Sequence, residues 1–159
     1  MIRPAIFVAI VIVQLSWMGG SHAGTLKPFV QGSYASLLAA REDEAFLLVI
    51  WSTTCVPCRD EFRLISEIRG TEGDFPVVLV STDTIADSSV AEQMLSMYKM
   101  DDFESWIFAE DNHARLRFEI DPSWYGEMPR SYFCDADHLC AGVSGSLEHQ
   151  QLLAWVRAL

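Results

Sequence analysis

The sequence predicts an α/β fold in which a mixed central sheet is flanked by helices. Two apolar runs, 45–51 and 76–81, have the length and composition of buried strands. Segments with apolar residues at helical spacing follow both runs, and the chain closes with a predicted hairpin and an amphipathic helix. Strands that alternate with helices before a hairpin imply one mixed sheet that is covered on both faces.

The first half of the chain is predicted to deliver a buried strand to the start of a helix. The expected elements are, in order, a lead-in at 24–30, a short helix at 33–41 with Ser33 as its N-cap, the strand at 45–51, and a helix that ends at Gly70. Phe62, Ile65 and Ile68 recur at helical spacing and mark the buried face of that helix.

The second half continues the alternation and then changes to a hairpin. The expected elements are a strand at 76–81, a helix that begins at 87 or 88, a short strand at 106–108, a helix at 112–120, strands at 130–135 and 139–143 around a turn at 136–138, and a helix at 146–159.

The first residues differ in composition from the rest of the chain. Arg3 precedes the largely apolar segment 5–18, and the small residues Ser21 and Ala23 follow it. This order is typical of a cleaved secretory signal peptide, and the apolar segment is short for a membrane span. We therefore expect a signal peptide at 1–23, a single domain at 24–159, and a periplasmic or secreted protein. Membrane anchoring is expected only if the signal remains uncleaved.

The charge balance is strongly acidic. The 159 residues include 22 acidic and 11 basic side chains, which gives a net charge of −11. Nucleic-acid binding requires clustered Lys and Arg, so we expect no nucleic-acid partner.

The segment Cys55-Val56-Pro57-Cys58 lies where the 45–51 strand gives way to a helix. A helix N-terminus stabilises a thiolate, and Pro57 suits a first helical turn. Cys58 lies close enough to Cys55 to close a small disulfide ring or resolve a mixed disulfide. The predicted chemistry is thiol–disulfide exchange, with half of a zinc site or an inert structural bridge as the alternatives.

On these features the chain resembles the exported TlpA-like (ResA-like) thiol–disulfide oxidoreductases of the thioredoxin superfamily. The resemblance covers 29–159 and is carried by Trp51, the cysteine motif 55–58, the following residues 59–62, and the stretches 126–129 and 132–135. It implies a thioredoxin-like fold with a central insertion, formed by the strand at 106–108 and the helix at 112–120.

The same resemblance implies the roles of individual residues. Cys55 attacks, Cys58 resolves, and a cis Met128–Pro129 peptide faces the cysteines so that an extended substrate pairs beside the mixed disulfide. The expected substrate-binding residues are Trp51, Thr54, Val56, Pro57 and Met128.

Three departures from the thioredoxin pattern affect the expected chemistry. Position 49 is valine where thioredoxin has a buried acid that helps to move protons, and Glu61 and Glu127 are the unranked substitutes. Thr54 replaces a common tryptophan, and Val56-Pro57 replaces the common Gly-Pro pair, which leaves the redox poise open.

A second cysteine pair flanks the predicted hairpin turn. Cys134 and Cys140 are symmetric about Asp137, so they would lie opposite each other on paired strands, at disulfide distance. The favoured interpretation is a structural disulfide. The alternatives are a second redox pair, two reduced thiols, and a copper or zinc site that includes His138.

The predicted function is therefore that of an exported reductase of protein disulfides, for example in cytochrome c maturation or metal-site assembly. It needs a protein substrate that bears a disulfide or a dithiol, a redox partner that recycles the cysteines, and no cofactor or metal. The alternatives are a protein-disulfide oxidant, a copper-handling protein of the same fold, and a non-catalytic module.

Overall fold

The computed structural model describes residues 26–159, so the predicted signal peptide lies outside the described residues. The elements are β1 (Lys27–Phe29), α1 (Ser33–Ala39), β2 (Phe46–Trp51), α2 (Val56–Glu72), β3 (Val77–Thr84), a short 3₁₀ helix η1 (Ile85–Asp87), α3 (Ser88–Met97), β4 (Glu104–Phe108), α4 (His113–Ile120), β5 (Arg130–Cys134), β6 (Cys140–Ser144) and α5 (His149–Val156). Among residues 26–159, none of the helices combines the length and the hydrophobicity that a membrane span requires.

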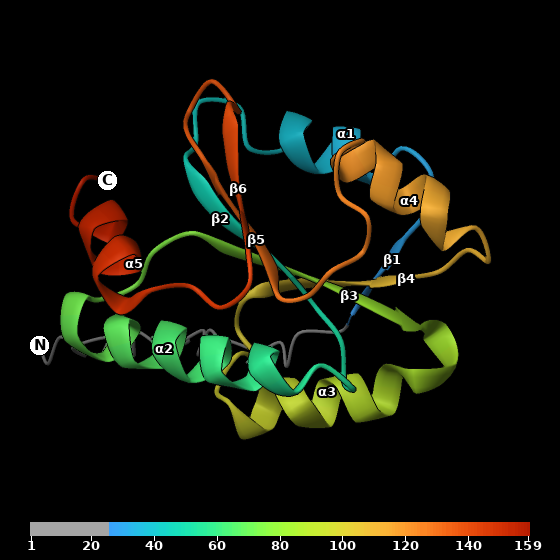
Figure 1. Ribbon diagram of the computed structural model, residues 1–159, viewed down its shortest axis with the longest axis horizontal. Coiled ribbons are helices and arrows are strands. Elements are labelled where there is room, and N and C mark those ends of the chain that lie inside the picture. The colour runs from blue at the N-terminus through green and yellow to red at the C-terminus, as the bar shows by residue number, and fades with distance from the viewer. Residues whose placement is uncertain (1–25) are drawn as a thin grey trace, which may run out of the picture.

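The six strands form one mixed sheet in the order β1-β4-β3-β2-β5-β6. The pairs β1·β4, β3·β4 and β2·β3 are parallel, whereas β2·β5 and β5·β6 are antiparallel. Helices α2, α3 and α5 lie on one face of the sheet, and α1 and α4 lie on the other (Figure 1). This is the predicted α/β architecture.

Strand β2 lies inside the sheet and is buried along its whole length. Leu47, Val49 and Trp51 pack with α2, α3 and α5, whereas alternate residues such as Leu48 and Ile50 pack with α1 and α4. Because both faces are covered, β2 is a continuous apolar run, which explains why this strand was predictable.

The strand and helix expected between the second buried strand and the hairpin are β4 and α4. Strand β4 lies between β1 and β3 in the sheet, and α4 covers the same face as α1 (Figure 1). The chain that leaves α4 at Asp121 reaches β5 through a loop that ends at Pro129.

The predictions for residues 27–29 and for the end of α2 need correction. Residues 27–29, expected only as a lead-in, form the edge strand β1, and an edge position tolerates Pro28 because one side of the strand needs no partner. Helix α2 continues through Gly70 to Glu72 and ends at Gly73, which has a φ of 92° and donates its N–H to the carbonyl of Arg69. A helix tolerates one interior glycine at modest cost, whereas its end requires the left-handed backbone that Gly73 supplies.

Helices α1 and α5 are shorter than expected. Helix α1 starts at Ser33 after the N-cap Gly32 and ends at Ala39. The Ser33 hydroxyl accepts a hydrogen bond from the N–H of Val30, which precedes the helix, instead of capping it. Helix α5 occupies His149–Val156 within the predicted segment.

Candidate active site

The two cysteines of the 55–58 motif lie at the junction of β2 and α2, joined as a disulfide with Cα atoms 5.4 Å apart. Cys55 is the N-cap of α2, and its Sγ accepts a hydrogen bond from the N–H of Cys58 at 3.2 Å. Cys55 is 8% exposed and Cys58 is fully buried. The sulfur of Cys55 is therefore the one that solvent and a partner reach.

The exposed rim around Cys55 is formed by three of the residues predicted to contact substrate. Thr54 precedes the cysteine, Val56 is 64% exposed, and Pro57 occupies the first turn of α2. Trp51, which was also expected to contact substrate, is fully buried and packs edge-on against Phe62 with ring centroids 5.1 Å apart. Its ring supports the site from within the core and offers no surface to a partner.

Asp83 fixes the loop between β2 and Cys55, a role that the sequence did not suggest. Its carboxylate accepts hydrogen bonds from the N–H of Thr53 at 2.7 Å, the hydroxyl of Thr53 at 3.0 Å and the hydroxyl of Ser81 at 2.7 Å. Asp83 belongs to the irregular end of β3, where the register with β4 shifts between Ser81 and Thr84. The predicted strand ends at residue 81, whereas β3 continues to Thr84, so no periodic pattern marks Asp83.

Pro129 lies beside the junction that carries the cysteines. Ile50 pairs with Arg130 in the antiparallel ladder, so the next residues outward, Trp51 and Pro129, lie at the same end of the sheet. The Met128–Pro129 peptide bond is cis, as the resemblance implies. The hydroxyl of Thr82 lies 3.6 Å from the sulfur of Met128 and 3.5 Å from the carbonyl oxygen of Trp51, which connects this loop to the end of β2.

The structure distinguishes the two acids that the sequence left unranked. Glu61 is 1% exposed, lies three residues after Cys58 on the buried face of α2, and accepts a hydrogen bond from the hydroxyl of Ser131 at 2.5 Å. Burial raises the pKa of Glu61 to about 7, against the opposing effect of the Ser131 hydrogen bond. Its Oε2 atom has no hydrogen-bond partner among residues 26–159.

Glu127 has the opposite character. Its side chain is 45% exposed, and the hydroxyl of Ser144 donates to it at 2.8 Å. That hydrogen bond lowers the pKa of Glu127 from its ordinary value. Of these two acids, Glu61 is therefore the buried carboxyl group that can exchange a proton near neutral pH, and it lies on α2, the helix that begins after Cys55.

Cys134 and Cys140 are directly opposite each other on β5 and β6 and form a second disulfide. Cys134 is fully buried on the face covered by α1 and α4, and the hydroxyl of Tyr34 lies 3.9 Å from the Sγ of Cys140. Cys134 pairs with Phe46 at the start of β2, five residues before Trp51, which corresponds to about 16 Å along the strand. The two disulfides lie at opposite ends of β2 and on opposite faces of the sheet.

His138, the third candidate metal ligand in the hairpin, is engaged elsewhere. Its Nε2 atom lies 2.8 Å from the carbonyl oxygen of Arg41. Within 26–159, no group of three or more His, Cys, Asp or Glu side chains is arranged to hold a metal ion.

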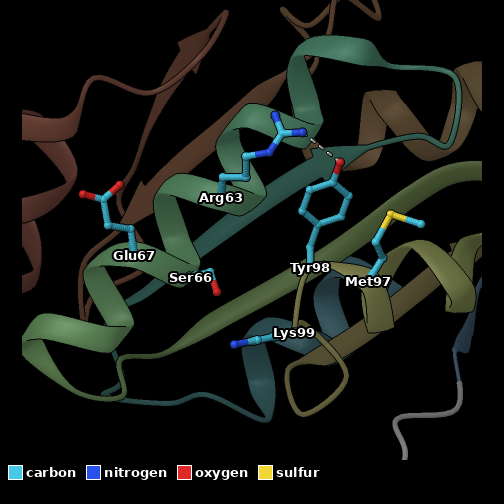
Figure 2. A pocket seen from close by; sticks show the side chains of 6 residues that line it. All are labelled: Arg63, Ser66, Glu67, Met97, Tyr98 and Lys99. Carbon is cyan, nitrogen blue, oxygen red and sulfur yellow. Dashed lines mark hydrogen bonds between the residues drawn. The ribbon is translucent and has the colours of Figure 1, made fainter.

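A pocket of about 430 Å³ opens between α2 and the end of α3 (Figure 2). It is lined by Arg63, Ser66, Glu67, Met97, Tyr98 and Lys99. The guanidinium of Arg63 donates to the hydroxyl of Tyr98 at 3.4 Å, as the dashed line shows. Neither cysteine of the 55–58 motif lines this pocket, so it is separate from the candidate active site.

Several solved structures are similar to this chain, whereas no protein-family model and no curated protein sequence matches it. A secreted disulfide oxidoreductase from Mycobacterium tuberculosis, homologous to E. coli DsbE, is 20% identical, with 76% of this chain and 86% of that chain covered and a TM-score of 0.59. A DsbF homologue from Corynebacterium diphtheriae is 21% identical, with 77% and 76% covered and a TM-score of 0.58.

A third solved structure, StoA from Bacillus subtilis, is 19% identical, with 72% of this chain and 83% of that chain covered and a TM-score of 0.53. The similarity extends over most of each chain, and it includes the mixed sheet with helices on both faces. The chain therefore has the thioredoxin-like fold that these oxidoreductase structures share.

Proposed function

We propose that the protein is an exported thiol–disulfide oxidoreductase that reduces protein disulfides, with Cys55 as the nucleophile. The observation that carries this proposal is the position of Cys55 at the N-cap of α2, where its sulfur accepts the N–H of Cys58. The same N–H and the helix dipole would stabilise a thiolate on Cys55.

The proposed reaction transfers two electrons. In the reduced protein, the Cys55 thiolate attacks one sulfur of a substrate disulfide, forms a mixed disulfide and expels the first substrate thiolate. The Cys58 thiolate then attacks the Sγ of Cys55, which breaks the mixed disulfide and expels the second substrate thiolate. The substrate gains two electrons, and the protein is left with the Cys55–Cys58 disulfide, which a dithiol partner must reduce before the next cycle.

Glu61 is the proposed proton acceptor for the second attack. The buried Cys58 thiol must lose its proton before it attacks, and water has little access to it. The carboxyl group of Glu61, with its raised pKa and a free Oε2 atom within the described chain, lies one helical turn away.

The Met128–Pro129 segment is the proposed binding platform for the substrate backbone. It lies beside Trp51 at the end of the sheet from which Cys55 emerges, so an extended peptide could pair with it while its sulfur is joined to Cys55. Thr54, Val56 and Pro57 would contact the residues that flank the substrate cysteine.

The reducing direction and the exported location are parts of the same proposal. The exported location is supported by the predicted signal peptide and by the similarity to a secreted disulfide oxidoreductase. The reducing direction rests on the resemblance to the TlpA-like oxidoreductases. Cytochrome c maturation and metal-site assembly are the proposed settings, since both require a dithiol to be kept reduced outside the cytoplasm. The Cys134–Cys140 disulfide is proposed to be structural, because its position in the fold separates it from the reacting pair.

The first test is the reduction potential of the Cys55–Cys58 couple in the mature protein. A potential near or below about −270 mV would support a reductase, whereas one near −120 mV would indicate an oxidant. The variant C58S should accumulate a mixed disulfide through Cys55, and C55S should not. Absence of a reversible couple, or tight stoichiometric metal retained through purification, would contradict the proposed function.

A further inference from the structure

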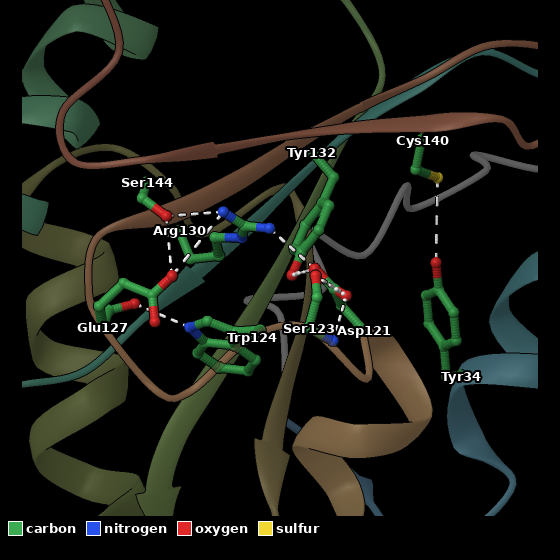
Figure 3. A network of polar contacts seen from close by, with 9 residues as sticks. All are labelled: Tyr34, Asp121, Ser123, Trp124, Glu127, Arg130, Tyr132, Cys140 and Ser144. Carbon is green, nitrogen blue, oxygen red and sulfur yellow. Dashed lines mark hydrogen bonds and ion pairs between the residues drawn. The ribbon is translucent and has the colours of Figure 1, made fainter.

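A network of polar side chains surrounds the loop that ends at Pro129 (Figure 3). We call it the Arg130 clamp, and its members are Asp121, Glu127, Arg130, Tyr132 and Ser144. They come from the end of α4, from the loop itself, and from the paired strands β5 and β6. The clamp therefore connects both ends of the loop to the edge of the sheet.

Arg130 is the central member of the clamp. Its Nη2 atom donates to Asp121 at 2.8 Å, and its Nη1 atom donates to the hydroxyl of Ser144 at 2.6 Å. The Ser144 hydroxyl in turn donates to Glu127 at 2.8 Å. Because Asp121 precedes the loop and Arg130 follows it, one guanidinium joins the two ends and, through Ser144, fixes Glu127 next to Met128.

Asp121 is the most heavily bonded carboxylate of the clamp. It also accepts hydrogen bonds from the hydroxyl of Tyr132 at 3.0 Å and from the N–H and hydroxyl of Ser123 at 2.8 and 2.6 Å. The side chains of Arg130 and Asp121 are 12% and 17% exposed. A charge pair this sheltered from water with several additional hydrogen bonds holds its geometry better than an exposed pair.

Gly142 shows that the fold provides space for this arrangement. A Cβ atom at position 142 would lie 2.5 Å from Nη2 of Arg130 and 3.0 Å from the ring of Tyr132. Gly142 lies within β6 opposite Tyr132, and its backbone φ is not positive, so the strand itself does not require a glycine there. The missing side chain is what lets the guanidinium lie across β6 and reach Asp121.

The backbone of the loop is fixed at the same places. The N–H of Gly145 donates to the carbonyl oxygen of Pro129 at 2.9 Å, and the indole N–H of Trp124 donates to the carbonyl oxygen of Glu127 at 2.8 Å. Met128 is thus left between two anchored carbonyl groups, beside the end of β2.

We propose that the Arg130 clamp positions the Met128–Pro129 segment for substrate docking, and that Arg130, Asp121 and Gly142 are positioning residues of this reaction. The inference rests on the proposed function. Tyr132 packs with the core on the α1 and α4 face, whereas Cys55 and Cys58 belong to the core on the opposite face. The clamp should therefore control the binding of an extended polypeptide without changing the chemistry of the thiols.

The variant G142A tests this most directly, because it displaces the guanidinium without changing any charge. D121N removes the carboxylate charge, and R130K keeps the charge but loses the two-pronged geometry. The matched control is V143A, which shortens a neighbouring side chain of β6 that packs against the core on the α2 and α5 face. Circular dichroism and thermal unfolding would establish that each variant is folded. If G142A does not fold, D121N and R130K carry the test.

Two disulfide substrates separate docking from chemistry. Insulin presents disulfides within a polypeptide, and 5,5′-dithiobis(2-nitrobenzoic acid) presents a small disulfide with no backbone to pair. With dithiothreitol as the electron source, G142A and D121N should raise the KM for insulin on the order of tenfold and leave kcat within about twofold, with a smaller effect for R130K. The rate with the small disulfide is measured in a single turnover of reduced protein freed of dithiothreitol, because dithiothreitol reduces that compound directly. This rate, the reduction potential and all V143A values should match the wild type.

The outcomes are distinguishable. If the wild type reduces both substrates and the clamp variants do so equally well, or lose activity equally with both, the inference is wrong and the proposed function stands. If the wild type reduces neither substrate, the proposed function fails and the inference fails with it.

Discussion

The hydroxyl of Ser131 on β5 donates to the carboxyl group of Glu61 on α2 at 2.5 Å, in a space closed to water. The contact links the strand that follows Pro129 to the helix that begins at Cys55. The buried acid near the cysteines is therefore carried by helix α2 rather than by the central strand β2. Position 49 of β2 is occupied by an apolar core residue, Val49.

Glu61 should make the oxidised protein less stable as the pH rises. Its pKa is raised by burial to about 7 from 4.5, so the folded state favours the protonated form. The contribution of Glu61 to the free energy of unfolding is therefore complete below about pH 4.5. It is lost as the pH rises through about 7, by about 3 kcal/mol in total. Urea unfolding at pH 5 and pH 8 should show this loss in the wild type and not in E61Q. The control E92Q, on the exposed surface of α3, should behave like the wild type; equal pH dependence in all three proteins would contradict the assignment.

Glu61 should also determine how fast the mixed disulfide is resolved. A positioned general base contributes about 100-fold or more to a rate. In single-turnover experiments near pH 7, E61Q should form the mixed disulfide at Cys55 at the normal rate and release it about 100-fold more slowly. Slowing of both steps by the same factor would indicate a structural effect instead.

Asp83 should stabilise the loop that precedes Cys55. Replacing it with alanine removes three hydrogen bonds and leaves the N–H of Thr53 unpaired, which should cost about 2 kcal/mol. Hydrogen exchange should show a faster rate at Thr53 in D83A, and chemical unfolding should show the lost stability. D137A, at the exposed hairpin turn, is the control. An unchanged exchange rate at Thr53 would mean that the loop is held by other contacts.

Removing the second disulfide should lower stability without altering the active site. The bridge between Cys134 and Cys140 closes a short loop, for which the chain-entropy model gives about 2 kcal/mol. C134A/C140A should lose about this free energy of unfolding and retain the reduction potential of the 55–58 pair. A shifted potential would show that the two pairs communicate.

The two glycines near the end of α2 should respond to alanine in opposite directions. Gly70 lies within the helix and has open space around its Cα, so G70A should stabilise the protein by up to about 1 kcal/mol. Gly73 has a φ of 92°, so G73A should destabilise it by about 1–2 kcal/mol. Thermal unfolding of the two variants would measure the direction of each change in stability. Stabilisation by G73A would show that α2 does not end at Gly73.

The sequence predicted those parts of the fold in which apolar residues recur at regular spacing or cysteines are spaced to form a disulfide. The buried strand β2, the helix that carries Phe62 and Ile65, and the pairing of Cys134 with Cys140 each follow from spacing along the chain. The edge strand β1 was missed because three residues that include Pro28 show no alternation, and β4, with which it pairs, is almost eighty residues away.

The polar interior of the site was harder to predict for a related reason. Glu61 could be named as one of two substitutes for the acid that is missing at position 49, but its burial against Ser131 depends on strands and helices that meet only in the folded chain. Asp83 and the partners of Arg130 give no local signal, since a carboxylate that accepts three or four internal hydrogen bonds cannot be distinguished in sequence from one exposed to water.

The separation of the two disulfides sets the electron capacity of the molecule. The pair at 55–58 and the pair at 134 and 140 lie at opposite ends of β2 and on opposite faces of the sheet, too far apart for a sulfur of one to attack the other within a chain. Working as proposed, each molecule would exchange one pair of electrons per encounter, although it contains four cysteines.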